Sequence, residues 1–297
     1  MRIGIDLGGT KIAAVALGPD GRELHRARVT TPRSYAGTLD AIAELVARAE
    51  SAAGERGTVG VGIPGALSAV TGRVKNANSI WLIGEDLSGD LERRVQRPVR
   101  VMNDANCFAL SEATDGAGAG AAVVFGVILG TGVGGGIVVD GRVLEGASRI
   151  AGEWGHNPLP WPTDAERPGP PCYCGQHGCI ETFCSGPGLE RDHTAATGEA
   201  KSGAAIGAAA AAGDAGATAT LERYVGRLAR GLATAINVLD PDVVVLGGGV
   251  SNLPGLADRV AAELPAWVFT DAVAARVARN RWGDESGVRG AAWLWPE

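Results

Sequence analysis

The 297-residue sequence lacks the features of a protein that works in a membrane or on nucleic acid. It contains no apolar run approaching the roughly 20 residues that span a bilayer, and its N-terminus does not resemble a secretion signal. It also has no excess of basic residues, since 27 Lys and Arg against 33 Asp and Glu give a formal net charge of -6. An acidic balance argues against nucleic acid or an anionic membrane as the main partner. We therefore expect a cytoplasmic protein with neither partner.

Cysteine is scarce as well, and three of the five cysteines lie in one short segment. Cys172, Cys174 and Cys179 are separated by spacings of two and five, with glycines that let the backbone wrap. Such thiolates suit one tetrahedral zinc ion, and His156 is the natural fourth ligand. A disulfide pair or uncoordinated thiols are the alternatives. A disulfide is disfavoured because there is no secretion signal.

Two acidic residues bracket this cysteine cluster. Glu153 precedes His156 by three residues, and Glu181 follows Cys179 by two. The metal does not need either carboxylate, yet a rigid metal site would fix the position of both. They are candidate ligands for the hydroxyl groups of a substrate.

The N-terminal glycine turn, Leu7-Gly8-Gly9-Thr10-Lys11, is not a P-loop, because Thr10 separates the second glycine from Lys11. It connects two expected antiparallel strands. Its backbone N–H groups can still cradle a phosphate, with the carboxylate of Asp6 at the end of the first strand. An ordinary hairpin with two glycines is the alternative.

The same pattern of strand, glycine turn and strand recurs later in the chain. Leu129-Gly130-Thr131-Gly132 follows an apolar strand and lies 122 residues (129 minus 7) after the first turn. Duplication suggests two like domains that face each other, each turn reaching for the phosphates of one nucleotide. Coincidence among the 46 glycines is the alternative.

A carboxylate follows another short strand. Val99 to Met102 is expected to be extended, and Asn103-Asp104-Ala105-Asn106 follows it directly at the start of a helix. Ligands of α/β sheets bind at the carboxyl ends of strands, so Asp104 is a candidate general base. The alternative is that Asp104 caps the helix.

A third glycine turn follows the apolar strand Val243 to Leu246. Gly247-Gly248-Gly249 has no side chains, so its backbone permits the close approach of a flat group such as adenine. A plain turn is the alternative.

Taken in order, these motifs resemble the ROK sugar kinases of the actin-like ATPase superfamily, and the resemblance covers essentially the whole chain. It implies an α/β fold of two ribonuclease-H-like (actin-like ATPase) domains with a cleft between them. The first domain would comprise residues 1–117, completed by the C-terminal helix 287–297. The second would comprise residues 118–286 and carry the zinc knuckle.

The resemblance also implies roles for individual residues. Asp104 would accept the proton of a sugar hydroxyl. The other sugar ligands would be Asn78, Asn103, Glu153, His156 and Glu181. ATP would be held by Gly8, Gly9, Thr10, Lys11, Gly130, Thr131 and Gly132 at its phosphates, and by Gly247 and Gly248 near its nucleoside. Asp6 would position Mg2+, and structural Zn2+ would be held by His156, Cys172, Cys174 and Cys179.

The reaction so implied is ATP-dependent phosphorylation of the 6-hydroxyl of a hexose. Fructose ranks first, because Val74 to Trp81, Trp154 with Asn157 to Trp161, and Trp293 to Pro296 resemble bacterial fructokinase of the mannofructokinase type. The alternatives are an N-acetylglucosamine kinase, a glucokinase or a mannokinase. Sugar-responsive transcriptional regulators of the family carry an N-terminal helix-turn-helix domain, for which the strand starting at Arg2 leaves no room. The family also suggests a homodimer.

Overall fold

The computed structural model describes residues 1–77 and 79–295, so the expected sugar ligand Asn78 lies outside the described residues. The chain divides into two compact units. One comprises Met1–Gly120, Gly136–Ala151 and Asp284–Glu297, and the other Ala121–Gly135 and Gly152–Gly283. The domain limits expected from the sequence stay a prediction. No helix among the described residues is long and apolar enough to cross a membrane.

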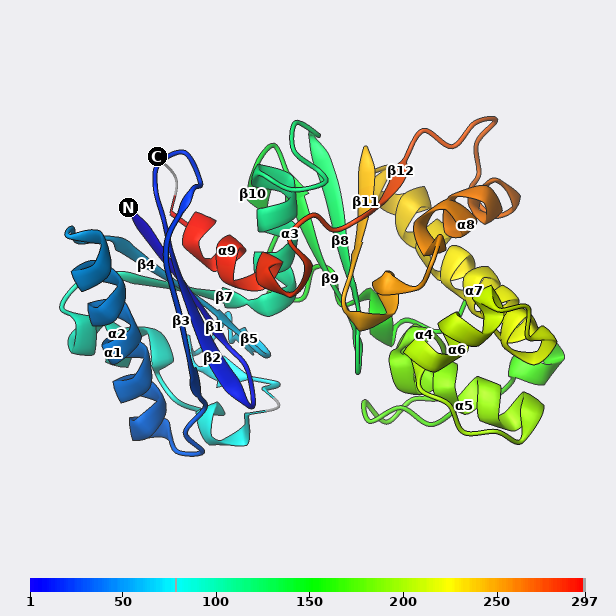
Figure 1. Ribbon diagram of the computed structural model, residues 1–297, viewed down its shortest axis with the longest axis horizontal. Coiled ribbons are helices and arrows are strands. Elements are labelled where there is room, and N and C mark those ends of the chain that lie inside the picture. Colours follow the sequence, from blue (N-terminus) through cyan, green and yellow to red (C-terminus); the bar gives the residue numbers. More distant parts are fainter. Residues whose placement is uncertain (78, 296–297) are drawn as a thin grey trace. The chain divides into compact units, whose positions relative to one another are not determined.

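The first sheet has the strand order β3-β2-β1-β4-β7 (Figure 1). Its strands are β1 (Arg2–Leu7), β2 (Lys11–Leu17), β3 (Glu23–Thr30), β4 (Thr58–Ile63) and β7 (Val99–Asn103). Strands β1, β2 and β3 pair antiparallel, as the opening hairpins predict, whereas β1, β4 and β7 are parallel. The carboxyl ends of β1 and β7 therefore lie at the same edge of the sheet.

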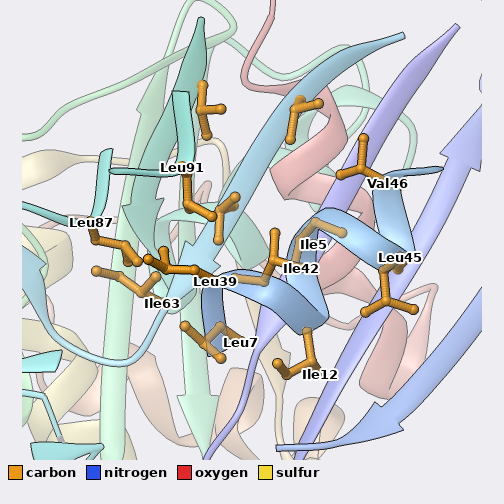
Figure 2. Packing of buried hydrophobic residues seen from close by; sticks show 14 of the residues in the cluster. Ile5, Leu7, Ile12, Leu39, Ile42, Leu45, Val46, Ile63, Leu87 and Leu91 are labelled. Carbon is orange, nitrogen blue, oxygen red and sulfur yellow. The ribbon is translucent and has the colours of Figure 1, made fainter. Parts of the chain in front are cut away.

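Helix α1 (Tyr35–Ala53) covers one face of this sheet together with α2 (Leu87–Val95). Ser34 caps α1 by accepting a hydrogen bond from Gly37 N, and Gly54 ends it with a φ of 73°. The apolar residues of α1 recur every three or four positions, so they share one face. Figure 2 shows this core, which includes Ile5, Leu7, Ile12, Leu39, Ile42, Leu45, Val46, Ile63, Leu87 and Leu91.

Helix α9 (Ser286–Trp293) packs against β1 and β4 of the same sheet and against α3 (Asp104–Thr114) (Figure 1). Helix α9 lies close to these strands because both carry a glycine where the helix packs. A Cβ atom on Gly4 or Gly60 would collide with the backbone of α9. The C-terminal helix is thus part of the unit that contains the N-terminus.

The second sheet has the order β10-β9-β8-β11-β12. Its strands are β8 (Val123–Leu129), β9 (Val133–Val139), β10 (Arg142–Val143), β11 (Val243–Gly247) and β12 (Arg276–Arg279). Strands β9 and β10 pair antiparallel, and β8, β11 and β12 are parallel. The two sheets thus share one strand order. This is the α/β, actin-like ATPase fold that the resemblance to the ROK sugar kinases implies.

The helices of the second unit are α4 (Ile180–Cys184), α5 (Gly186–Thr197), α6 (Gly203–Ala211), α7 (Ala215–Leu239) and α8 (Leu256–Glu263). The other four pack against α7, and Tyr224 of α7 donates a buried hydrogen bond of 2.8 Å from its Oη to Cys184 O of α4. The alanine-rich stretch 187–216 contributes α5, α6 and the start of α7.

The remaining elements are short. A separate two-stranded sheet pairs β5 (Ala66–Leu67) with β6 (Val74–Lys75). The 3-10 helices are η1 (Ile80–Leu82), η2 (Trp154–His156), η3 (Asp164–Glu166), η4 (Gly249–Asn252), η5 (Leu264–Ala266) and η6 (Gly283–Glu285).

Candidate functional site

The four expected metal ligands come together in the second unit. One donor atom each from His156, Cys172, Cys174 and Cys179 lies within 4.8 Å of the others. Cys174 Sγ is 3.6 Å from Cys179 Sγ, and Cys172 Sγ is 3.6 Å from His156 Nδ1. The edges of a tetrahedral zinc site are about 3.8 Å between sulfurs and about 3.6 Å between sulfur and nitrogen, from the usual Zn–S and Zn–N lengths. The donor set and its spacing therefore fit zinc, and the five cysteines form no disulfide.

The two ring nitrogens of His156 have different neighbours. Nδ1 lies toward the thiolates, whereas Nε2 lies 3.0 Å from the hydroxyl of Tyr173. The two rings meet edge to face, with centroids 5.1 Å apart. The ring nitrogen that faces away from the cysteines therefore has a protein partner.

Glu181 links the cysteine cluster to the second glycine turn. Its Oε2 accepts a hydrogen bond of 2.9 Å from Val133 N, and its Oε1 lies 4.0 Å from Cys172 Sγ. A Cβ atom on Gly132 would come within 2.6 Å of Oε2, so a larger residue here would require the Glu181 carboxylate to shift. Glu181 is half-buried and Glu153 is exposed.

The segment between His156 and the cysteines is anchored by a buried ion-pair network. Glu166 Oε1 accepts hydrogen bonds of 2.8 Å from both Arg227 and Arg230 of α7, and the Glu166 and Arg230 side chains are only 8% exposed. Burial alone would raise the pKa of Glu166, but Arg230 and Arg227 outweigh it and hold the pKa at about 2.

In the first unit, Thr31 supports the glycine turn through two hydrogen bonds. Gly8 N donates to Lys11 O, 3.0 Å away, while Thr31 binds Gly8 O through its hydroxyl and Thr10 O through its N–H. Gly9, Thr10 and Lys11 are exposed. Asp6 lies at the end of β1, where burial raises its pKa and Lys11 partly opposes that shift.

Asn103 and Asp104 lie at the junction of β7 and α3. The capping alternative for Asp104 was wrong: Asn103 is the N-cap, and its Oδ1 accepts from Ala105 N and Asn106 N. Asp104 Oδ1 accepts hydrogen bonds from Asn103 Nδ2, at 3.1 Å, and from Ala105 N, at 2.8 Å. These bonds fix the orientation of the carboxylate.

The carboxylates of Asp104 and Asp6 act on a common neighbour. Burial raises the pKa of the Cys107 thiol well above its usual value, and the charges of Asp104 and Asp6 add to that shift. Both expected acidic residues of the first unit therefore lie near the same point of α3, at the carboxyl edge of the sheet.

A cavity of about 730 Å³ lies in the second unit. Of the expected nucleotide residues, Gly130 and Thr131 line it. Gly248 lies nearby with a φ of 80°, and a Cβ there would collide with Leu129 O. Neither Gly247 nor Gly248 is part of the lining, which takes Gly249 and Val250 from the same turn.

Most of the cavity wall was missed by sequence reasoning. It comes from α5, the start of α6 with its cap, the end of η4 and the segment after it, including Pro187, Leu189, Glu190, Ser202, Gly203, Asn252 and Pro254. Helix α6 is held at the cavity by Glu190, whose Oε1 accepts a hydrogen bond of 2.9 Å from Gly203 N. The sequence signal for the start of α6 was Ser202, a residue type typical of helix N-caps, whose side chain accepts a hydrogen bond from Ala205 N.

The sequence matches a known protein family along almost its whole length. The model of the ROK family matches residues 2–297. The chain belongs to the ROK family. It is 44% identical to the N-acetyl-D-glucosamine kinases of Shigella flexneri and Escherichia coli K12, over 99% of this chain and 99% of each relative.

Solved structures of the ROK family agree with this assignment. A ROK hexokinase from Thermus thermophilus superposes with a TM-score of 0.85 at 36% identity, over 98% of this chain and 96% of that one. A ROK glucokinase from Streptomyces griseus, in complex with glucose and AMPPNP, gives 0.80 at 33% identity, over 99% and 98%. The chain is thus a sugar kinase, a phosphotransferase with an alcohol acceptor.

Proposed function

We propose that the protein transfers the γ-phosphoryl group of ATP to the 6-hydroxyl of a hexose. The observation that carries this proposal is the fixed carboxylate of Asp104 at the carboxyl end of β7. Phosphoryl transfer mainly requires that the two substrates be positioned and the charge on the phosphates be neutralised. It also requires one base for the attacking hydroxyl. Asp104 serves as that base, and Asn103, Glu153, His156 and Glu181 bind other hydroxyls.

ATP is the proposed phosphoryl donor. The cavity in the second unit is large enough for a nucleoside and has the mostly apolar wall that such groups prefer. The turn at Gly130, Thr131 and Gly132 offers its backbone to the phosphates, as does the exposed turn Gly8–Lys11 of the first unit. The complex of the Streptomyces griseus relative with AMPPNP supports this choice of nucleotide.

Two metal ions complete the proposal. Mg2+ neutralises charge on the phosphates, and Asp6 is the carboxylate placed to hold it, through water. Zn2+ is held by the His156 and three-cysteine cluster, whose four protein donors leave no position for an activated water. Its role is to fix the segment that carries Glu153 and Glu181.

Each of two acceptor sugars is supported by a separate observation. The whole-chain relatives at 44% identity are N-acetyl-D-glucosamine kinases, and these comparisons favour N-acetylglucosamine. Fructose is supported by the resemblance of the segments around Trp81 and Trp161 to fructokinases, because these segments adjoin the proposed sugar ligands Asn78 and His156.

Release of ADP with and without sugar tests the proposal. Initial rates with fructose, N-acetylglucosamine, glucose and mannose would show which acceptor raises turnover most. Equal ADP release in the absence of every sugar would refute a hexose kinase. A kcat/KM advantage for one of the first two sugars would decide between them.

A further inference from the structure

Glu190 of α5 is the one acidic residue among the described residues that line the cavity of about 730 Å³ in the second unit. Its Oε1 accepts a hydrogen bond of 2.9 Å from Gly203 N, which fixes the carboxylate at the start of α6. Within residues 1–77 and 79–295, no group donates to its Oε2. Both oxygens of a carboxylate accept hydrogen bonds, so Oε2 is available to a ligand in the cavity.

A carboxylate in a cavity assigned to ATP has to face a donor group of the nucleotide. Glu190 would weaken ATP binding if it lay against a phosphate, because like charges repel. A nucleoside offers two kinds of donor to a carboxylate, the hydroxyls of ribose and the amino group of adenine. The position of Glu190 along α5 distinguishes between them.

Helix α5 begins against the turn proposed to bind phosphate. Gly186 N donates a hydrogen bond of 2.8 Å to Gly130 O, so the first residue of α5 is fixed to that turn. Glu190 follows four residues later, about 6 Å along the helix axis at about 1.5 Å per residue. Ribose is joined directly to the α-phosphate of a nucleotide, whereas the amino group lies at the far end of the base. A ribose hydroxyl is therefore the donor within reach of Glu190.

Another part of the cavity wall is apolar and suits the base. Ala204 and Ala208 lie one turn apart on α6, and Leu253 and Pro254 follow η4. A Cβ atom on Gly207 would come within 2.6 Å of Leu253 Cδ2, so α6 packs closely against this segment. These apolar side chains offer a surface for a flat ring and no acceptor for a hydroxyl. This arrangement leaves the ribose to Glu190.

We propose that Glu190 binds the ribose of the nucleotide: its Oε2 accepts a hydrogen bond from a ribose hydroxyl, while its Oε1 holds Gly203 N. The carboxylate then selects ribonucleotides over deoxyribonucleotides as phosphoryl donors. This inference rests on the proposed function, because that function places ATP in this cavity.

The test compares the full-length wild-type protein with Glu190→Gln. Glutamine can still accept from Gly203 N but lacks the second carboxylate oxygen. Glu222→Gln is the matched control, since it removes the same charge from an exposed position on α7 outside the cavity lining. Calorimetry measures the Kd of ADP, 2′-deoxyADP, 3′-deoxyADP and inosine diphosphate, the last of which lacks the amino group of adenine. Urea unfolding shows whether each variant is folded.

We expect the wild type and Glu222→Gln to bind ADP about 10-fold or more tightly than one of the two deoxy forms, as for one hydrogen bond to a charged acceptor. In Glu190→Gln the affinity for ADP should fall to within about 3-fold of the affinity for that deoxy form. The affinity of all three proteins for inosine diphosphate should follow their affinity for ADP.

Equal wild-type affinity for ADP and both deoxy forms would overturn the inference, as would full discrimination in Glu190→Gln. An equal loss of affinity for all four nucleotides, or loss of the folded state, would also overturn it, because the carboxylate would then only hold α6. A preference for ADP over inosine diphosphate that disappears in Glu190→Gln would mean that the carboxylate binds the base instead. Wild-type protein that binds none of the four nucleotides would refute the proposed function itself.

Discussion

Glu181 Oε2 accepts a hydrogen bond of 2.9 Å from Val133 N, which joins the cysteine cluster to the glycine turn between β8 and β9. Glu181 follows the cluster residue Cys179 by two positions, so its carboxylate moves with the cluster. We therefore expect a disturbance of the cysteine cluster to reach Gly132 and the turn proposed to bind phosphate. The glycine turn of the first unit has no such link to a cluster residue among the described hydrogen bonds.

Cys174→Ser should therefore lose zinc and affect the two substrates unequally. Sugar affinity and turnover should fall by about tenfold or more, because the cluster fixes both Glu153 and Glu181. ATP affinity should fall less, through the bond from Val133 to Glu181. Metal analysis and separate titrations of sugar and nucleotide measure these effects.

A cysteine outside the cluster provides the control for this variant. Cys184→Ala should retain zinc and both affinities, since Cys184 is buried on α4 away from the donor atoms. Full activity of a zinc-free Cys174→Ser protein would contradict the proposed role of the metal.

Asp104→Asn keeps the shape of the side chain but removes the proposed base. We expect kcat to fall about 100-fold or more, while sugar binding persists. Asp140→Asn is a suitable control, because Asp140 has a φ of 48° that asparagine also tolerates. A near-native kcat of Asp104→Asn would remove Asp104 from the catalytic role.

Gly248→Ala should destabilise the nucleotide side of the second unit. The backbone at Gly248 has a φ of 80°, and an added Cβ would collide with Leu129 O, just before the turn proposed to bind phosphate. We expect a loss of about 1–3 kcal/mol in unfolding free energy, together with weaker AMPPNP binding. Gly226→Ala, where a Cβ meets nothing within 4 Å, should be neutral or slightly stabilising. Urea unfolding of both variants checks this, and equal effects would be inconsistent with strain at Gly248.

Acid should weaken the ion-pair network of Glu166. Its pKa is about 2 in the folded protein, below the ordinary 4.5, so its contribution is complete above about pH 4.5 and declines as the pH falls toward 2. Glu166→Gln leaves Arg227 and Arg230 without their shared carboxylate and should cost about 3–5 kcal/mol at neutral pH. The difference in unfolding free energy between wild type and variant should shrink across this window. A difference independent of pH would argue against ionised Glu166 as the source.

Local sequence patterns predict much of the fold. The limits of α1 follow from Ser34 and Gly54, which cap an unbroken apolar stripe. The cluster of His156 with three cysteines can also be predicted from the sequence, because the three cysteines lie within eight residues. The N-cap of α3 is Asn103 and not Asp104, because the extended backbone of Asn103 lets its Oδ1 accept from both Ala105 N and Asn106 N.

Other parts of the site depend on tertiary contacts that no local pattern records. The bond between Glu181 and Val133 joins residues 48 positions apart. The cavity wall of α5 and α6 comes from an alanine-rich stretch without hydrophobic periodicity, and its position depends on Glu190 and Gly203. Such contacts become visible only when the fold brings the segments together.

The most direct test of the account is identification of the phosphorylated product. The protein is incubated with ATP, Mg2+ and fructose or N-acetylglucosamine, and 31P and 13C NMR locate the new phosphate, with Asp104→Asn run in parallel. The account predicts a hexose 6-phosphate formed with one ADP per sugar, and about 100-fold less product with Asp104→Asn. ATP hydrolysis without sugar phosphate, or equal product from both proteins, would contradict it.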